Sequence, residues 1–293
     1  MQSGIINVLK PPGMTSHDVV SYIRRLYSIK RVGHAGTLDP AAAGVLPVFI
    51  GNATRLVEYL ADADKSYRAE LTFGFETDTG DDTGKISNSR PYIRPKPSEI
   101  EAALASFIGV NEQIPPMYSA IKIDGKKLYE LARQGQVVER KPRKIVIDAI
   151  SLITEGETGI VFDVTCSKGT YIRVLCSDIG YRLNCLAVMS FLVRTRVGHF
   201  HLEESLTLEE IAANKEQAVQ NADSVLTHLP AIVLSELESQ AIKNGRSICC
   251  SQSGSDLIKM YDLHNTFIGI GRETCQMGGQ ATLTPVKILS PGL

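Results

Sequence analysis

The chain has 293 residues, of which 43% are hydrophobic and 22% charged, a composition typical of a soluble globular protein with one large domain and room for a small one. Its formal net charge of -1 argues against a protein that coats nucleic acid, although one face can still be basic. No apolar run approaches the roughly 18 residues of a membrane span, and the N-terminus lacks the pattern of a signal peptide. We therefore expect a cytoplasmic protein without a membrane segment.

The cysteines and histidines show no pattern typical of a metal centre. Two histidines, His199 and His201, could share one strand face, but without further ligands they are a weak metal signal. We predict no metal. The six cysteines form no CxxC pair, which favours reduced, mostly buried side chains at Cys166, Cys176, Cys185, Cys249, Cys250 and Cys275.

The N-terminal segment begins with an apolar strand over residues 4–9, stopped by a Lys-Pro-Pro-Gly sequence. Thr15 is then expected to cap a helix that reaches about Tyr27, with Asp18 completing a capping box. Lys10, which opens the Lys-Pro-Pro-Gly sequence, is either a surface lysine or a brace for the loop that follows, and we favour the brace.

Residues 31–55 hold four glycines, two prolines and a single acidic residue, Asp39. Glycine and proline restrict and shape the backbone, so Asp39 should lie in a tightly formed loop just before a buried strand at residues 45–50. A rigid loop that presents one carboxylate suits a nucleophile or general base. The alternative is an aspartate that only forms a turn by bonding its own backbone. His34 lies close by in the sequence.

Residues 54–60 are expected to form a short helix, followed by a strand over residues 67–75 in which apolar and polar side chains alternate. Tyr67 is the first member of the apolar face, and the core is its expected place. The acidic sequence TDTGDDTG at residues 77–84 lacks the closing glutamate of a calcium loop, so we interpret it as a loop at the rim of a cleft.

The middle of the chain contains a helix and a basic insert. Residues 98–108 should form an amphipathic helix that begins with a capping box of Ser98 and Glu101. Residues 121–127 indicate a hairpin with Asp124 and Gly125 in its turn, followed by a short helix closed by Gly135. Residues 120–145 carry eight basic and three acidic side chains, so the insert at about 113–142 is either a phosphate-binding element or a solvated basic loop.

Two paired strands are expected at residues 144–152 and 159–166, then a helix to about residue 179 and a strand over 187–200. Arg173 by itself could be an ordinary charge on the helix surface. Arg194 and Arg196 share one face of the last strand and would either reach phosphate or be solvated. Residues 205–223 are expected to be helical, and a boundary follows at 227–230, which divides the chain into domains 1–229 and 230–293.

The C-terminal part begins with a helix capped by Ser235 and Glu238 that ends at Gly245. Short strands are predicted at residues 257–261, 266–270 and 281–289. Its few basic residues make an RNA contact there a weaker prediction than in the insert.

Several strings taken together resemble the TruB family of tRNA pseudouridine synthases: KPPGMTSHD and GHAGTLDPAAAGVLPV near the N-terminus, CSKGTYIRVLCSDIG in the middle, and FLVRTRVGHF after it. The resemblance covers about residues 4–200. It implies an α+β fold with a mixed, mainly antiparallel sheet, a basic insert that closes over an RNA stem-loop, and a small C-terminal PUA-like, β-rich RNA-binding domain.

The resemblance also assigns roles to residues that match the family motifs. Asp39 matches the catalytic nucleophile, Arg173 the arginine that pairs with it, and Tyr67 the tyrosine that stacks on the target uracil. Tyr171 matches a position that lines the uracil pocket and Leu192 one that packs on the flipped base. Asp81 is the best match for an aspartate that supports the site, although Asp78 and Asp82 stay possible.

His34 is a candidate to fill the space that the extruded base leaves, and Lys10 and Arg194 complete the predicted substrate-binding set. The implied reaction converts uridine to pseudouridine at position 55, in the T-loop of transfer RNA. It needs no cofactor, because one C–N bond is exchanged for one C–C bond in the same nucleotide. We expect a monomer that acts on tRNA without a protein partner.

Two alternatives remain open. One is a non-catalytic RNA chaperone or binding module that acts on tRNA. The other is a guide-RNA-dependent enzyme like the archaeal and eukaryotic relatives, which require protein partners and have more elaborate C-terminal regions.

Overall fold

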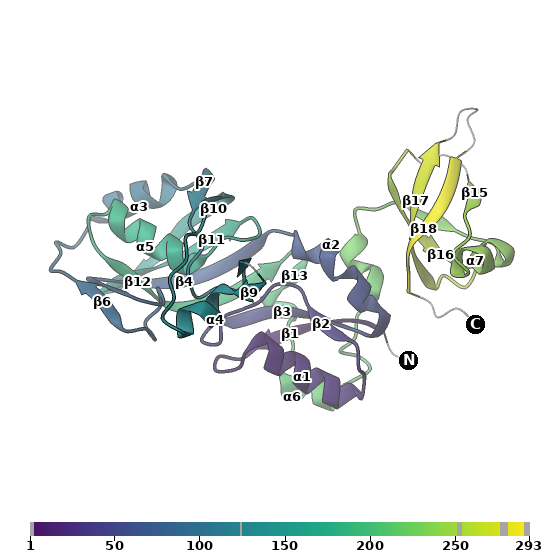
Figure 1. The fold of residues 1–293 in the computed structure, drawn as a ribbon, viewed down its shortest axis with the longest axis horizontal. Coiled ribbons are helices and arrows are strands. Elements are labelled where there is room, and N and C mark those ends of the chain that lie inside the picture. The colour runs from purple at the N-terminus through teal and green to yellow at the C-terminus, as the bar shows by residue number, and fades with distance from the viewer. Residues whose placement is uncertain (1–2, 124, 251–253, 276–280, 290–293) are drawn as a thin grey trace.

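The chain forms an elongated molecule built on two sheets, one at each end (Figure 1). This computed structural model describes residues 3–123, 125–250, 254–275 and 281–289. Asp124, in the predicted hairpin turn, and the side chain of Cys275 lie outside the described residues. No helix in the described ranges is long and apolar enough to cross a membrane.

The larger sheet has nine strands in the order β1-β3-β12-β4-β11-β10-β7, with β2 beside β3 and β13 beside β12. Its neighbours pair antiparallel except β3 and β12, which run parallel. The α+β prediction with a mixed, mainly antiparallel sheet is confirmed. The strands are β1 Gly4–Lys10, β2 Val32–His34, β3 Ala43–Ile50, β4 Lys65–Phe73, β7 Gly109–Gln113, β10 Arg143–Glu155, β11 Gly159–Cys166, β12 Ala187–Val197 and β13 Phe200–His201.

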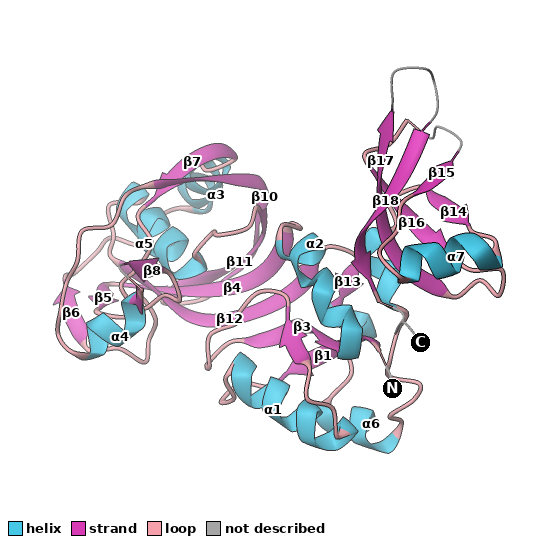
Figure 2. Ribbon diagram, turned by 45° about the vertical axis from the view of Figure 1, so that its right-hand side comes forward, coloured by secondary structure: helices cyan, strands magenta, loops and turns pink. Residues whose placement is uncertain are grey.

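Four of the helices around this sheet belong to two separate apolar clusters. Val19 and Ile23 of α1 (Ser16–Tyr27) pack with Leu208 and Ile211 of α6 (Leu208–Ala213) against β1 and β3. Helices α3 (Pro97–Ala105) and α5 (Ile172–Arg182) pack instead against β10, β11 and β12 (Figure 2). Shorter helical segments are η1 Gly51–Leu56, α2 Val57–Ala61, α4 Leu128–Arg133, η2 Leu202–Glu204 and η3 Ala222–Leu226.

The capping box at the start of α1 is confirmed, since Thr15 Oγ1 accepts from Asp18 N (3.0 Å) and Asp18 Oδ2 accepts from Thr15 N (2.9 Å). The capping box predicted for Ser98 and Glu101 is wrong. The N-cap of helix α3 lies two residues earlier, at Lys96, where Glu99 Oε2 accepts from Lys96 N (2.7 Å), and Pro97 is the first helical residue.

Two other boundaries differ from the predictions. The strand predicted for residues 67–75 begins at Lys65 and breaks at Gly74, whose positive φ of 103° separates β4 from β5 (Phe75–Thr77), which pairs with β6 (Ile86–Ser89). The helix predicted for 205–223 is also wrong. That segment contains only α6 and the start of η3, because the chain crosses beside β1, where Leu206 N donates to Asn7 O and Gln220 N to Ile5 O.

The insert contains the hairpin expected from the sequence. Strands β8 (Lys122–Ile123) and β9 (Lys126–Lys127) pair, Gly125 has a φ of 81°, and α4 follows directly. Three of the predicted buried cysteines, Cys166, Cys176 and Cys185, are free thiols in the core of the larger sheet, whereas Cys249 is exposed and Cys250 partly exposed.

The second sheet is small and β-rich, with the order β14-β16-β17-β18-β15 and helix α7 (Glu236–Lys243) packed beside it. It touches the rest of the chain at η1, where Asn52 Nδ2 donates to Leu289 O (2.7 Å) and Arg55 Nη1 to Ile288 O (2.6 Å). The division at residues 229 and 230 stays a prediction. The strands are β14 Ala231–Val233, β15 Ile248–Cys250, β16 Leu257–Tyr261, β17 Phe267–Cys275 and β18 Ala281–Ile288.

Candidate active site

A pocket of about 350 Å³ lies where the loop before β3 meets β4, β12 and the start of α5. The sheet order explains this meeting, because β12 pairs with β3 on one side and β4 on the other. Arg194 therefore lies opposite both Gly44 and Tyr67. The pocket lining includes six predicted site residues: Asp39, Tyr67, Tyr171, Arg173, Leu192 and Arg194.

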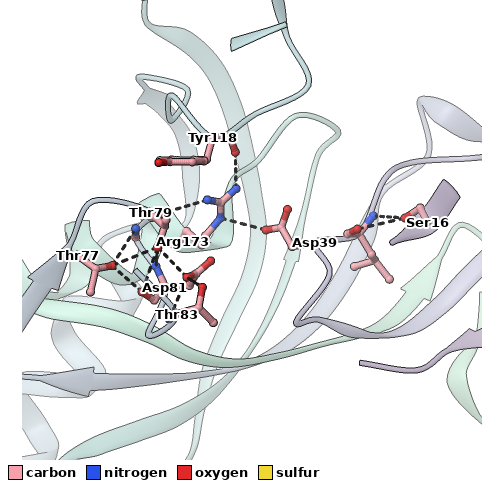
Figure 3. A network of polar contacts seen from close by, with 10 residues as sticks. Ser16, Asp39, Thr77, Thr79, Asp81, Thr83, Tyr118 and Arg173 are labelled. Carbon is pink, nitrogen blue, oxygen red and sulfur yellow. Dashed lines mark hydrogen bonds and ion pairs between the residues drawn. The ribbon is translucent and has the colours of Figure 1, made fainter. Parts of the chain in front are cut away.

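Asp39 and Arg173 form an ion pair in this pocket (Figure 3), with 3.0 Å between Arg173 Nε and Asp39 Oδ2. The guanidinium also donates through Nη1 to Thr79 O (2.7 Å) and through Nη2 to Tyr118 O (2.7 Å). The Arg173 side chain is only 7% exposed, whereas that of Asp39 is 38% exposed. The surface-charge interpretation of Arg173 is therefore wrong: the arginine is a buried, three-point support that directs a more accessible carboxylate into the pocket.

The acidic loop at 77–84 supplies the Thr79 carbonyl, one of the two main-chain groups that hold the Arg173 guanidinium. Asp81 Oδ1 accepts from Thr79 Oγ1 (2.7 Å) and Thr83 Oγ1 (2.6 Å), and Thr77 Oγ1 donates to Asp81 O (2.6 Å). Asp81 thus folds the loop whose Thr79 carbonyl meets Arg173 (Figure 3). No side-chain pattern marks Thr79 or Tyr118 for this role, because both act through main-chain carbonyls.

Lys10 braces the loop that carries Asp39, and its side chain is fully buried. Lys10 Nζ donates to Pro11 O (2.9 Å), Met14 O (2.6 Å) and Pro40 O (3.2 Å). The bracing prediction is confirmed and the surface alternative is wrong. Burial lowers the pKa of Lys10 to about 8.

Ser16, which the sequence analysis missed, holds the other side of the same loop. Its Oγ accepts from Leu38 N (2.9 Å) and is 3.1 Å from Leu38 O. The turn itself is closed by the main chain, from Ala42 N to Asp39 O (3.1 Å), which leaves the Asp39 carboxylate for Arg173.

Arg194 is 1% exposed, so the prediction that it would be solvated or reach phosphate is wrong. Its Nε donates to Val45 O (2.8 Å) and its Nη2 to Gly36 O (3.0 Å), which ties the loop that carries Asp39 to β3. A second buried cation, Lys65, also lines the pocket, and its Nζ donates to Ala61 O (3.1 Å) and Ala63 O (2.7 Å). Burial lowers the pKa of Lys65 to about 8.

Part of the pocket wall is apolar. Tyr67 and Leu192 are 8% and 7% exposed, and burial raises the pKa of the Tyr67 hydroxyl, so the phenol is neutral. Tyr171 is held through its main chain by Gln113, which accepts from Tyr171 N (3.0 Å) and donates to Tyr171 O (3.2 Å). Gln113 is 3% exposed and was also missed by the sequence analysis.

His34 lies at the end of β2, and the pocket lining begins two residues beyond it, at Gly36. Its Nδ1 is buried without a hydrogen-bond partner among the described residues. Burial and the nearby Arg194 charge lower the pKa of His34, so the imidazole is neutral at pH 7. The structure therefore places His34 beside the pocket rather than in its lining.

Comparisons with known proteins agree with this fold and pocket. A family model described as "TruB family pseudouridylate synthase (N terminal domain)" matches residues 24–172, and two TruB C-terminal models match residues 173–236 and 230–276. The chain is 50% identical over 270 residues to "tRNA pseudouridine synthase B" of Caldanaerobacter subterraneus subsp. tengcongensis. The aligned region covers 92% of this chain and 94% of that protein. The protein of the same name from Bacillus subtilis is 46% identical over 256 residues. This aligned region covers 84% of this chain and 83% of that protein.

Solved structures with this fold include a "Cbf5-Nop10-Gar1 Complex", with a TM-score of 0.72 and 27% identity over 98% of this chain and 85% of that one. An "H/ACA RNP bound to a substrate RNA containing 2'-deoxyuridine" gives a TM-score of 0.72 and 25% identity over 98% of this chain and 85% of that one. Fold and sequence together define a pseudouridine synthase. The chain belongs to the TruB family, which confirms the resemblance and the enzyme class.

Proposed function

We propose that the chain converts uridine to pseudouridine in the T-loop of tRNA, with Asp39 as the nucleophile and without a cofactor. The observation that carries the proposal is the Asp39–Arg173 ion pair, which holds one accessible carboxylate in a pocket that Tyr67, Tyr171 and Leu192 also line. The relatives named above as tRNA pseudouridine synthase B support tRNA as the substrate.

The target base has to leave its stack to enter such a pocket. Extrusion costs roughly a few kcal/mol, and stacking in the pocket offsets part of it. Tyr67, Tyr171 and Leu192 offer the base aromatic and aliphatic surfaces, and Asp39 lies on the same wall as Arg173. His34, which lies beside the pocket, would then fill the space that the base vacates.

The reaction is an isomerisation within one nucleotide. The bond between uracil N1 and ribose C1′ breaks, the bond between C5 and C1′ forms, C5 loses a proton and N1 gains one. Asp39 would attack C1′ or uracil C6, or would assist elimination to a glycal. Since no net oxidation or reduction occurs, the chain's own residues are sufficient: Asp39 reacts, Arg173 aims it, and the apolar part of the wall retains the freed uracil.

Tyr67 would assist removal of the C5 proton only after losing its own. Burial favours the neutral phenol, so its first contribution is to pack against the base.

Mapping of pseudouridine in an unmodified tRNA transcript tests the substrate. Purified enzyme, incubated with the transcript alone in EDTA, should produce one carbodiimide-dependent primer-extension stop, in the T-loop. A stop elsewhere would overturn the T-loop assignment. Because the solved neighbours are complexes with further proteins, modification that appears only after a partner or guide RNA is added would favour the guide-dependent alternative instead.

A further inference from the structure

A second, larger cavity lies at the end of the molecule opposite the C-terminal sheet. It measures about 730 Å³ and is lined by the segment 90–95, by α3 and by the C-terminal end of α5. Both views place α3, α5 and β6 at one end and β14–β18 at the other, with the middle of the large sheet between them (Figures 1 and 2). The cavity is separate from the pocket around Asp39, and the mechanism proposed above does not use it.

Two guanidinium groups in this cavity are free to bind an anion. Arg90 and Arg182 are exposed, and neither forms a side-chain hydrogen bond or an ion pair with any residue that the structure describes. Arg94, the third arginine of the lining, is engaged by Glu155 (3.7 Å) and Glu157 O (2.9 Å). The lining contains one acidic residue, Glu99, whose carboxylate accepts from the main chain at the start of α3. The cavity therefore favours a negatively charged occupant.

The remaining surface suits the sugar and base of a nucleotide. Pro91, Tyr92 and Pro95 supply flat apolar surface, and Tyr92 is positioned by Phe73, with the ring centroids 5.7 Å apart. Arg182 lies over the ring of Phe107 at 5.8 Å, which holds its guanidinium at the cavity wall. Arginines beside aromatic and apolar surface are the usual means of holding unpaired RNA.

Helix α5 links this cavity to the Asp39 pocket. Arg173 is near its first residue and Arg182 is its last, so at 1.5 Å per residue their Cα atoms are about 14 Å apart. The arginines are therefore too far from the pocket to contact the target nucleotide itself, but near enough to contact another part of the same folded RNA. The C-terminal domain lies at the other end of the molecule, so it and this cavity would contact different parts of a bound RNA (Figure 1).

We propose that the groove formed by Arg90 and Arg182 binds backbone phosphates of the substrate RNA outside the T stem-loop. The inference rests on the proposed function for the identity of the RNA. It adds a contact surface at the end of the catalytic domain remote from the C-terminal domain, and it assigns two phosphates to two named side chains.

The test compares two RNAs with three proteins. Filter binding of a full-length tRNA transcript and of its isolated T stem-loop is measured over 50–300 mM salt with wild type, Arg90→Ala/Arg182→Ala and Arg25→Ala. Arg25 is a matched control, because it is another exposed arginine in the last turn of a helix, α1. The double variant should bind full-length tRNA at least about tenfold more weakly near 0.1 M salt, and its salt slope should fall by about 1.5 to 2. The stem-loop should bind within twofold of wild type in all three proteins.

Full-length binding by the double variant within twofold of wild type would overturn the proposal, as would an equal loss for both RNAs or an equal loss for Arg25→Ala. Tritium release from the stem-loop distinguishes a failure here from a failure of the proposed function. It reports on the Asp39 pocket alone and should be unchanged by the double variant.

Discussion

Replacement of Arg173 by lysine tests whether the geometry of the guanidinium, and not only its charge, directs Asp39. The arginine makes three contacts at 2.7 to 3.0 Å, to Asp39, Thr79 O and Tyr118 O. A lysine ammonium is a point donor that cannot occupy three planar positions, so it would leave at least one buried carbonyl unpaired and the carboxylate poorly aimed. Loss of one preorganised electrostatic contact costs about 10² to 10³ in turnover, or about 3 to 4 kcal/mol.

We therefore expect kcat for a T stem-loop RNA to fall about 10²- to 10³-fold in Arg173→Lys. Binding should change by less than about threefold, because Arg173 is 7% exposed and lies behind Asp39. The control is Arg68→Lys, which alters another arginine–carboxylate pair, to Asp163 at 2.8 Å, on the exposed face of β4. The measurement is single-turnover tritium release at saturating enzyme. A rate for Arg173→Lys within threefold of wild type would refute the reasoning.

The remaining predictions concern the residues that hold the site. Lys10→Met should slow turnover at least tenfold and lower the free energy of unfolding by about 1 to 3 kcal/mol, because three carbonyls lose a charged donor. Tritium release measures the turnover and urea unfolding measures the stability. Unchanged values of both would contradict the bracing role of Lys10. Gln113→Leu should lower the free energy of unfolding by about 1 to 2 kcal/mol and reduce kcat, because both hydrogen bonds to the Tyr171 main chain are lost, while the circular-dichroism spectrum stays native. A wild-type kcat would contradict the role given to Gln113. The pKa of Lys10 is about 8 in the folded chain and 10.5 in the unfolded one, so between these pH values the unfolded chain binds more protons. The contribution of Lys10 to the free energy of unfolding therefore rises with pH, by up to about 1.4 kcal/mol per pH unit. The free energy of unfolding of wild type minus that of Lys10→Met should increase from about pH 7.5 to 9.5, and a decrease would mean that the pKa is shifted in the opposite direction.

The parts of the site that the sequence predicted are those marked by side chains in shaped loops. The glycines and prolines around Asp39 indicated a rigid loop, and strand alternation placed Tyr67 on the buried face, where it is 8% exposed. The pairing of Arg173 with Asp39 was predicted from the resemblance to a family and not from a sequence pattern. The two residues are 134 positions apart, so no local signal indicates their 3.0 Å contact.

The misses have equally specific causes. Arginine in a strand is normally solvated, and only the parallel pairing of β3 with β12 brings the carbonyls of Gly36 and Val45 within reach of Arg194. The supports from Thr79 and Tyr118 are main-chain groups, which every residue carries. At α3 the signal was present but overlooked, since a proline at the first helical position marks the start more strongly than Ser98 does.

The central claim is that the Asp39 carboxylate carries the chemistry. Its most direct test is tritium release from [5-³H]uridine-labelled T stem-loop RNA by wild type, Asp39→Asn and Asp163→Asn. The last is a control that makes the same carboxylate-to-amide change at another arginine pair. We predict release by wild type and Asp163→Asn, and none by Asp39→Asn although it binds the RNA nearly as tightly. Turnover by Asp39→Asn above a trace would contradict the account, and no release by any of the three, with binding retained, would favour an RNA-binding module.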